Sequence, residues 1–533
     1  MTTITLSLVS HTNVGKTTLA RTLLGRDIGE VRDAPHVTEF ADEHLLVQTV
    51  NGHRLVLWDT PGFGDSVRLA RRMRQFGGFE PLRWLLGQVW DRWRDRALWL
   101  SQQALRHVRE GSDVLLYLVN ASEPDAGYLP SEMQLLGWAG QPVLVLLNQL
   151  GAPRQTALEQ AEVERWRERL APWTHVRAVL PLDAFARCWV HERVLLDAVR
   201  DVLAADNGNG VDSGDSTGRL AAMDELRAAW LAEREATFER SCAEIAASLA
   251  RTALAREEVG EAATLSGRLR EWGARLVQPE GTDPGDAAQQ RLLQTLAEEV
   301  RQSTRKLLEL HGIGRGAAPP ATRPQGHPAG AGDAADPVAR VLARVANQVE
   351  SHRRVPEGRA ALFGGALTGA LAGLKADIAT GGLTLGGGLI AGGILGALGA
   401  AGLARGINVV RGTGRSWVAW SSAAMGPLVD AALLRYLAVA HYGRGRGEWA
   451  EGEAPAHWPA TVEAALAARR SEFERLWNER SEAGPGSEQR LAEAVQPLVA
   501  AALRDVLAAL YPASPPPAAV SQGVSPAPQN PRP

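Results

Sequence analysis

The residues best suited to chemistry lie near the N-terminus, in the run SHTNVGKTT at positions 10–18. A loop between a strand and a helix binds phosphate when its N–H groups and the helix N-terminus point at one anion. In such a loop Lys16 is expected to reach the β- and γ-phosphates, and the Thr17 hydroxyl to bind Mg²⁺. Ser10 stands where the pattern G-x-x-x-x-G-K-[ST] has its first glycine. The run predicts a nucleotide-binding P-loop, whose expected contacts are Ser10, Asn13, Val14, Gly15, Lys16, Thr17 and Thr18.

The scarcity of lysine supports this interpretation. The chain has 57 Lys plus Arg residues, yet its only lysines are Lys16, Lys306 and Lys375. A lysine at position 16 therefore indicates a need for a compact point charge rather than a planar guanidinium. A chance Gly-Lys-Thr in an ordinary loop is the alternative.

The elements that must position this loop follow from the flanking sequence. Residues 4–9 are an apolar run of strand length, and a helix is expected after Gly15. Two further apolar runs, 45–50 and 54–58, are separated by Asn51-Gly52, which is a hairpin signal. The near-continuous apolar runs 112–121 and 142–150 are typical of a parallel sheet covered on both faces, and 176–182 is expected to be the last strand. Together they predict an α/β domain with a mostly parallel sheet.

Two more segments are expected to meet the phosphates. The second strand of the hairpin ends in Asp59-Thr60-Pro61-Gly62, where an acid suits a magnesium contact and the Gly62 N–H suits the γ-phosphate. Thr38 is the only threonine between Thr22 and Thr49, and it lies where a switch threonine would complete the metal site. The predicted magnesium ligands are Thr17, Thr38 and Asp59. The predicted catalytic groups are Lys16, Thr38 and Gly62.

With Asn-Val-Gly-Lys-Thr at 13–17 and Asp-Thr-Pro-Gly at 59–62, the first 200 or so residues resemble the Era-like and TrmE-like P-loop GTPases. The resemblance implies a G domain that binds and hydrolyses GTP. It also implies that Asn13 helps to bind a potassium ion and that G-domain dimerisation completes the site; a loop-shaping role is the alternative for Asn13. Phe63 stands where Ras-like enzymes carry the glutamine that orients water, and an apolar side chain cannot do so.

The base-reading motif departs from this family. The family reads guanine with Asn-Lys-x-Asp, whereas this chain has Asn148-Gln149-Leu150-Gly151. Loss of the aspartate removes the main discriminator against adenine. Guanine preference is thus implied by the resemblance alone, and ATP remains an alternative substrate. Asp183 follows the last predicted strand and is a candidate substitute reader of the base.

Composition limits the remaining function classes. At 533 residues the chain needs more than one core. Its net charge of −3 and pI near 6.5 indicate no global field for nucleic acid, so no specific nucleic-acid partner is predicted. The two cysteines cannot form a disulfide framework, and no secretion signal is apparent at the N-terminus. These features predict a cytoplasmic location, with peripheral or integral attachment at the inner membrane as the alternative.

The rest of the chain is predicted to be an all-α module with a glycine-rich helical hairpin. Leu and Ala recur at helical spacing in 219–276, 286–311, 416–442 and 459–510. In 360–404, Gly365, Gly369 and Gly373 and then Gly388, Gly392 and Gly396 recur every fourth residue, which favours close helix packing. This hairpin is either buried in protein or a membrane contact. The predicted boundaries are a G domain at 1–205, helical regions at 206–312 and 341–511, a disordered linker at 313–340 and a disordered tail at 512–533.

The module resembles the uncharacterised helical region that some bacterial GTPases carry behind an Era-like G domain. The sequence therefore predicts a GTPase switch that binds GTP and GDP with Mg²⁺, and with K⁺ as a further cofactor. Alternatives are a nucleotide-binding scaffold that hydrolyses weakly, favoured by Phe63, and a membrane-associated GTPase of dynamin-like behaviour, favoured by residues 360–404.

Overall fold

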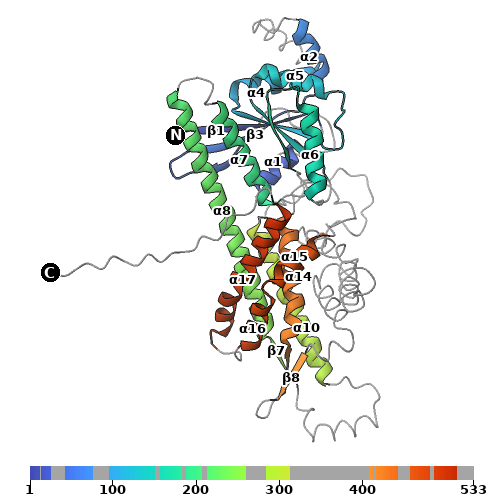
Figure 1. The fold of residues 1–533 in the computed structure, drawn as a ribbon, viewed down its shortest axis with the longest axis vertical. Helices are drawn as coiled ribbons and strands as arrows, with labels where there is room; N and C mark the ends of the chain where they lie inside the picture. Colours follow the sequence, from blue (N-terminus) through green and yellow to red (C-terminus); the bar gives the residue numbers. More distant parts are fainter. Residues whose placement is uncertain are drawn as a thin grey trace, which may run out of the picture.

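In the computed structural model, a sheet domain lies at one end of the molecule and a helical bundle at the other (Figure 1). The structure describes residues 1–12, 14–25, 42–75, 95–150, 156–182, 188–206, 213–259, 284–312, 407–411, 416–441, 457–480 and 485–512. The predicted sites Asn13, Thr38 and Asp183, the glycine-rich segment 360–404, the linker 313–340 and almost all of the tail lie outside these residues.

The N-terminal domain contains a six-stranded sheet in the order β2-β3-β1-β4-β5-β6. Its strands are β1 (Thr3–Ser10), β2 (Asp42–Gln48), β3 (Arg54–Asp59), β4 (Val114–Asn120), β5 (Val143–Asn148) and β6 (Val176–Pro181). All neighbouring pairs are parallel except β2 and β3, which form the antiparallel hairpin predicted around Asn51-Gly52. The prediction of a mostly parallel sheet is confirmed.

Helices cover both faces of this sheet, which explains why its central strands are apolar throughout. They are α1 (Lys16–Leu24), α2 (Ser66–Gln75), α4 (Arg96–Gly111), α5 (Leu129–Ala139), α6 (Thr156–Leu170) and α7 (Trp189–Asp206). Alternate residues of β4 enter different cores: Leu116 and Leu118 join the cluster with α1 and α7, whereas Leu115 and Tyr117 join the cluster with α4, α5 and α6.

The second part of the molecule is mainly helical. Its helices are α8 (Ser213–Leu254), α10 (Pro284–Leu310), α14 (Ser422–Ala440), α15 (Trp458–Ala467), α16 (Arg470–Glu479) and α17 (Ser487–Leu510). The 42-residue α8 runs along the sheet domain and continues into the bundle, where it packs against α10, α14 and α17 (Figure 1).

A small antiparallel sheet departs from the helical prediction. It has the order β7-β9-β8, formed by β7 (Arg256–Val259), β8 (Ile407–Arg411) and β9 (Ser416–Trp420). The prediction of helix from residue 416 was wrong for 416–420, because the sequence Ser-Trp-Val-Ala-Trp is rich in aromatic and β-branched residues and favours strand. Val418 and Trp420 are accordingly buried, and β9 pairs on both edges.

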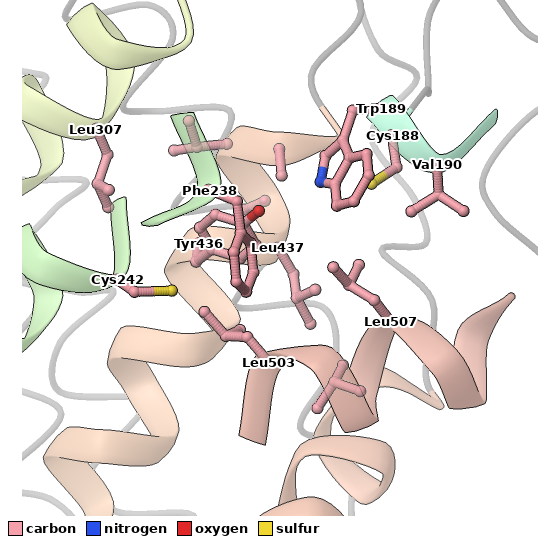
Figure 2. Packing of buried hydrophobic residues seen from close by; sticks show 14 of the residues in the cluster. Cys188, Trp189, Val190, Phe238, Cys242, Leu307, Tyr436, Leu437, Leu503 and Leu507 are labelled. Carbon is pink, nitrogen blue, oxygen red and sulfur yellow. The ribbon is translucent and has the colours of Figure 1, made fainter. Parts of the chain in front are cut away.

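One hydrophobic cluster joins the two parts of the molecule. Its members include Leu6 of β1, Val190 of α7, Phe238 of α8, Tyr436 of α14 and Leu507 of α17. Figure 2 shows Cys188, Trp189 and Val190 beside Tyr436, Leu437 and Leu507 of the bundle. The bundle is therefore packed against the sheet domain through a shared core.

Among the described residues one helix, α14, is long and apolar enough to span a membrane, with a mean hydropathy of 1.4. Two thirds (67%) of the 18-residue stretch of α14 that meets this criterion is buried inside the protein, as in a core helix.

Candidate nucleotide-binding site

The P-loop joins the end of β1 to the start of α1, as predicted. Gly15 caps α1 with φ of 100°, a conformation that L side chains rarely adopt. A Cβ at Gly15 would also lie 2.9 Å from Asn148 Nδ2. Glycine is thus required at this position both by the backbone conformation and by the closeness of β5.

Lys16 lies between the P-loop and the loop that follows β3. Its side chain is buried, and its Nζ donates a hydrogen bond to Ser10 Oγ at 3.0 Å. A Cβ built on Gly62 would meet Nζ at 2.9 Å, so the ammonium group and Gly62 are close neighbours. Burial lowers the pKa of Lys16, and the charges of Asp59 and Glu132 oppose that shift. The arrangement presents a cation where the sequence predicted a phosphate.

Thr17 and Asp59 come together as the predicted metal ligands should. The Thr17 hydroxyl donates to Asp59 Oδ2 at 2.6 Å. Asp59 is 3% exposed, and burial raises the pKa of its carboxyl group. Its second oxygen, Oδ1, is buried without a hydrogen-bond partner among the described residues. A hydroxyl beside an unsatisfied carboxylate oxygen is the oxygen donor set that Mg²⁺ prefers, so these residues fit the metal.

Asn148 connects the base-reading strand to the P-loop. It is fully buried at the end of β5, and its Nδ2 donates to the Val14 carbonyl oxygen at 2.7 Å. Gln149, the next residue, has φ of 59°, which turns the chain sharply after the strand. Asn148 therefore aligns the segment that follows β5 with the phosphate loop, which is a structural role in addition to any contact with a base.

The other predicted P-loop residues divide between backbone and core roles. The Val14 side chain belongs to the hydrophobic cluster, and the Thr18 side chain is 5% exposed at the start of α1. Ser10 is fully buried, and its hydroxyl also donates to the His11 carbonyl oxygen.

Phe63 stands where Ras-like enzymes carry the glutamine that orients water, and the structure gives it a different role. Its side chain is fully buried in the cluster with Val9, Leu69 and Leu98, and its N–H donates to the Ser10 carbonyl oxygen at 3.0 Å. The side chain anchors the loop instead of facing a ligand, and it offers no group to orient water.

Sequence reasoning missed two residues that shape this site. Thr60 Oγ1 donates to the Leu8 carbonyl oxygen at 2.5 Å and ties the loop after β3 to β1. Glu132, on α5, is fully buried beneath the P-loop and contacts His11. Thr60 belongs to the quoted Asp-Thr-Pro-Gly motif, but nothing in the local sequence indicates that a glutamate 121 residues after His11 approaches it.

Two family models and one curated relative match parts of the chain. Residues 5–149 match the family model described as 50S ribosome-binding GTPase. Residues 349–508 match a domain of unknown function, DUF3482. GTPase Der of Deinococcus deserti is 26% identical over 152 residues, which are 28% of this chain and 27% of that protein. The match therefore spans about a quarter of the relative's length.

Two solved structures of Era are similar to part of the chain. One is a point variant of Aquifex aeolicus Era bound to GDP and AlF4⁻, with 17% identity, 34% of this chain and 52% of that chain covered, and a TM-score of 0.26. The other is Era in complex with MgGDPNP and nucleotides 1506–1542 of 16S ribosomal RNA, with 17% identity, coverage of 34% and 51%, and a TM-score of 0.25. Scores of this size support no conclusion about function.

Proposed function

We propose that this chain, whose N-terminal region is a P-loop GTPase domain of the Era and Der type, is a switch that hydrolyses GTP to GDP and phosphate. The observation that carries the proposal is the placement of the Lys16 ammonium between Ser10 Oγ and Gly62, beside the Thr17–Asp59 pair. A buried cation next to two oxygen ligands suits a triphosphate and its metal. The proposed domain division remains 1–205 for the G domain and 206–511 for the helical regions and the linker between them.

In the proposed reaction a water molecule attacks the γ-phosphate in line with the departing GDP. Mg²⁺, when bound with the nucleotide, neutralises charge on the phosphate oxygens. Thr17 and Asp59 are proposed to hold the metal, with Thr38 as a third ligand. Lys16 offsets negative charge that develops on the phosphates, and the Gly62 N–H is proposed to contact the γ-phosphate. Asn13, K⁺ and a G-domain dimer are proposed to supply the activation that Phe63 does not.

Coupling to the bundle is proposed to run through α8. Three arginine–carboxylate pairs join this helix to α7: Arg227 with Asp197 at 2.5 Å, Arg200 with Asp224 at 2.7 Å and Arg234 with Glu192 at 3.1 Å. In the turn between β2 and β3, Asn51 Nδ2 donates to Glu225 Oε2 at 2.8 Å. Because α8 contacts the G domain along its first part and the bundle along the rest, movement of one part would displace the other.

The start of α7 offers a second route. Cys188 and Trp189 follow directly after residues 183–187, where the family places its last base-contacting loop, and both side chains lie in the shared core (Figure 2). Trp189 packs against Phe238 with ring centroids 6.4 Å apart. A contact between Asp183 and the base would therefore be coupled to the packing between the G domain and α8.

A nucleotide-binding scaffold that barely hydrolyses is the second candidate, because the buried side chain of Phe63 has no group that could orient water. Binding and turnover of the full-length chain separate the two candidates. We expect tight binding of GTP and GDP with Mg²⁺, its loss in Lys16→Ala, and hydrolysis that K⁺ accelerates. Binding without turnover, with or without K⁺, would favour the scaffold. Equal binding of ATP would mean that Gly151 has removed guanine selection, and no nucleotide binding would overturn both candidates.

A further inference from the structure

A buried carboxylate lies beneath the P-loop and belongs to neither the phosphate ligands nor the metal ligands. Glu132 of α5 is fully buried. The Tyr117 hydroxyl, from β4, donates to its Oε2 at 2.6 Å, and His11 Nδ1 lies 2.7 Å from its Oε1. Burial and the neighbouring charge of Glu132 raise the pKa of Tyr117 well above its ordinary value, so this phenol remains a hydrogen-bond donor. Both carboxylate oxygens are thus satisfied, as a buried charge requires.

The histidine that completes this cluster is part of the P-loop itself. His11 follows Ser10, and its ring stacks on Tyr128 with centroids 4.0 Å apart and planes 7° from parallel. The backbone of His11 forms a bridge with Phe63, next to Gly62. The contact with Glu132 therefore holds the P-loop at the point where it meets the loop that carries the proposed γ-phosphate donor.

Glu132 also acts on the site through its charge. Together with Asp59 it raises the pKa of Lys16 against the effect of burial, which favours the ammonium form. A buried carboxylate adds little stability compared with apolar residues of the same size, because the cost of its desolvation offsets its attractive contacts. Stability is therefore not a sufficient reason for burying Glu132, whereas orientation of the P-loop is.

We propose that Glu132 is a positioning residue for the nucleotide phosphates: it holds His11 and so fixes the P-loop backbone in the conformation that binds them. The inference rests on the proposed nucleotide binding. It assigns to α5 a direct influence on phosphate affinity, and α5 also packs against α2, the helix that follows the Gly62 loop. Glu132 would then influence the positions of both the P-loop and α2.

The test compares affinities of the full-length chain for GDP with Mg²⁺ and the folding of each variant by thermal unfolding. The double variant His11→Phe/Glu132→Gln keeps a ring on Tyr128 and an acceptor for Tyr117, leaves no buried charge, and should bind GDP about 10-fold more weakly. His11→Asn places an amide donor where Nδ1 lies and should remain within about 3-fold of wild type. Glu110→Gln, at an exposed carboxylate on α4, is the matched control and should change nothing.

Two results would overturn the inference. One is a folded double variant that binds GDP as tightly as wild type. The other is a His11→Asn variant as weak as the double variant, because the hydrogen-bond donor would then not be the relevant feature. If the double variant fails to fold, the single variant His11→Phe, which removes the Nδ1 donor and keeps a ring on Tyr128, decides the same question by its GDP affinity. Failure of wild type itself to bind GDP, indistinguishable from Lys16→Ala, would instead overturn the proposed function on which the inference rests.

Discussion

Replacement of Gly15 by alanine should destabilise the nucleotide-free protein through two separate effects. The first is backbone strain, because φ is 100° and a non-glycine residue held in such a conformation costs about 1–3 kcal/mol. The second is the new Cβ, which would lie 2.9 Å from Asn148 Nδ2. Displacing Asn148 breaks its 2.7 Å hydrogen bond to the Val14 carbonyl oxygen, which should add about 1–3 kcal/mol because the bond is buried.

A matched control lies at the other end of the same helix. Gly25 caps the C-terminus of α1 with φ of 65°, and a Cβ there would meet nothing within 4 Å. Gly25→Ala should therefore show the backbone strain alone. The difference between the two variants, measured by urea unfolding, contains the clash with Asn148, about 1–3 kcal/mol, and the greater strain of φ of 100° compared with 65°.

A double-mutant cycle identifies the partner. In an Asn148→Ala background the clash is absent, so the excess cost of Gly15→Ala over Gly25→Ala should fall to the difference in backbone strain between the two positions. The reasoning would be refuted if Gly15→Ala were no more destabilising than Gly25→Ala in the wild-type background. It would also be refuted if the whole excess persisted after Asn148 was removed, because strain in the backbone and not the contact with β5 would then account for the whole effect.

Three further predictions concern the switch loop, pH and the bundle. In Gly62→Ala the Cβ would lie 2.9 Å from Lys16 Nζ and 3.1 Å from Thr12 Cα, so binding of both nucleotides should weaken. A non-hydrolysable GTP analogue should lose about 10-fold more affinity than GDP, because it also loses the N–H proposed for the γ-phosphate; equal losses would contradict this. Burial lowers the pKa of His441 to about 4, so the unfolded chain takes up a proton at higher pH than the folded chain does. The free energy of unfolding should therefore fall by up to about 3 kcal/mol as pH drops from 6.5 to 4, and thermal unfolding should find a smaller loss in His441→Gln. Arg504→Met should cost about 2–4 kcal/mol in urea unfolding, because Glu235 and Glu239 lose a largely buried partner. Arg106→Met, at an exposed pair with Glu110, should cost under about 0.5 kcal/mol, and similar values for the two variants would count against a buried network.

Local sequence was sufficient for the elements that carry the proposed chemistry. The apolar run before Ser10, the Gly15-Lys16-Thr17 triplet and the Asn51-Gly52 turn each depend on residues that are close in the chain, and β1, α1 and the β2–β3 hairpin formed as predicted. The near-continuous apolar runs likewise predicted β4 and β5, because strands buried on both faces have no polar alternation. The sequence was less informative at 416–420, where a short run has too few residues to distinguish the period of a strand from that of a helix.

The assembled site depended on tertiary structure, because its decisive contacts join residues far apart in sequence. The amide of Asn148 reaches Val14 across 134 positions, and the carboxylate of Glu132 reaches His11 across 121. Such contacts follow from the order of strands in the sheet, which the spacing of residues along one strand does not specify. For the same reason the sequence determined by itself that Phe63 could not orient water, while only the fold decided that its side chain is fully buried as part of the core.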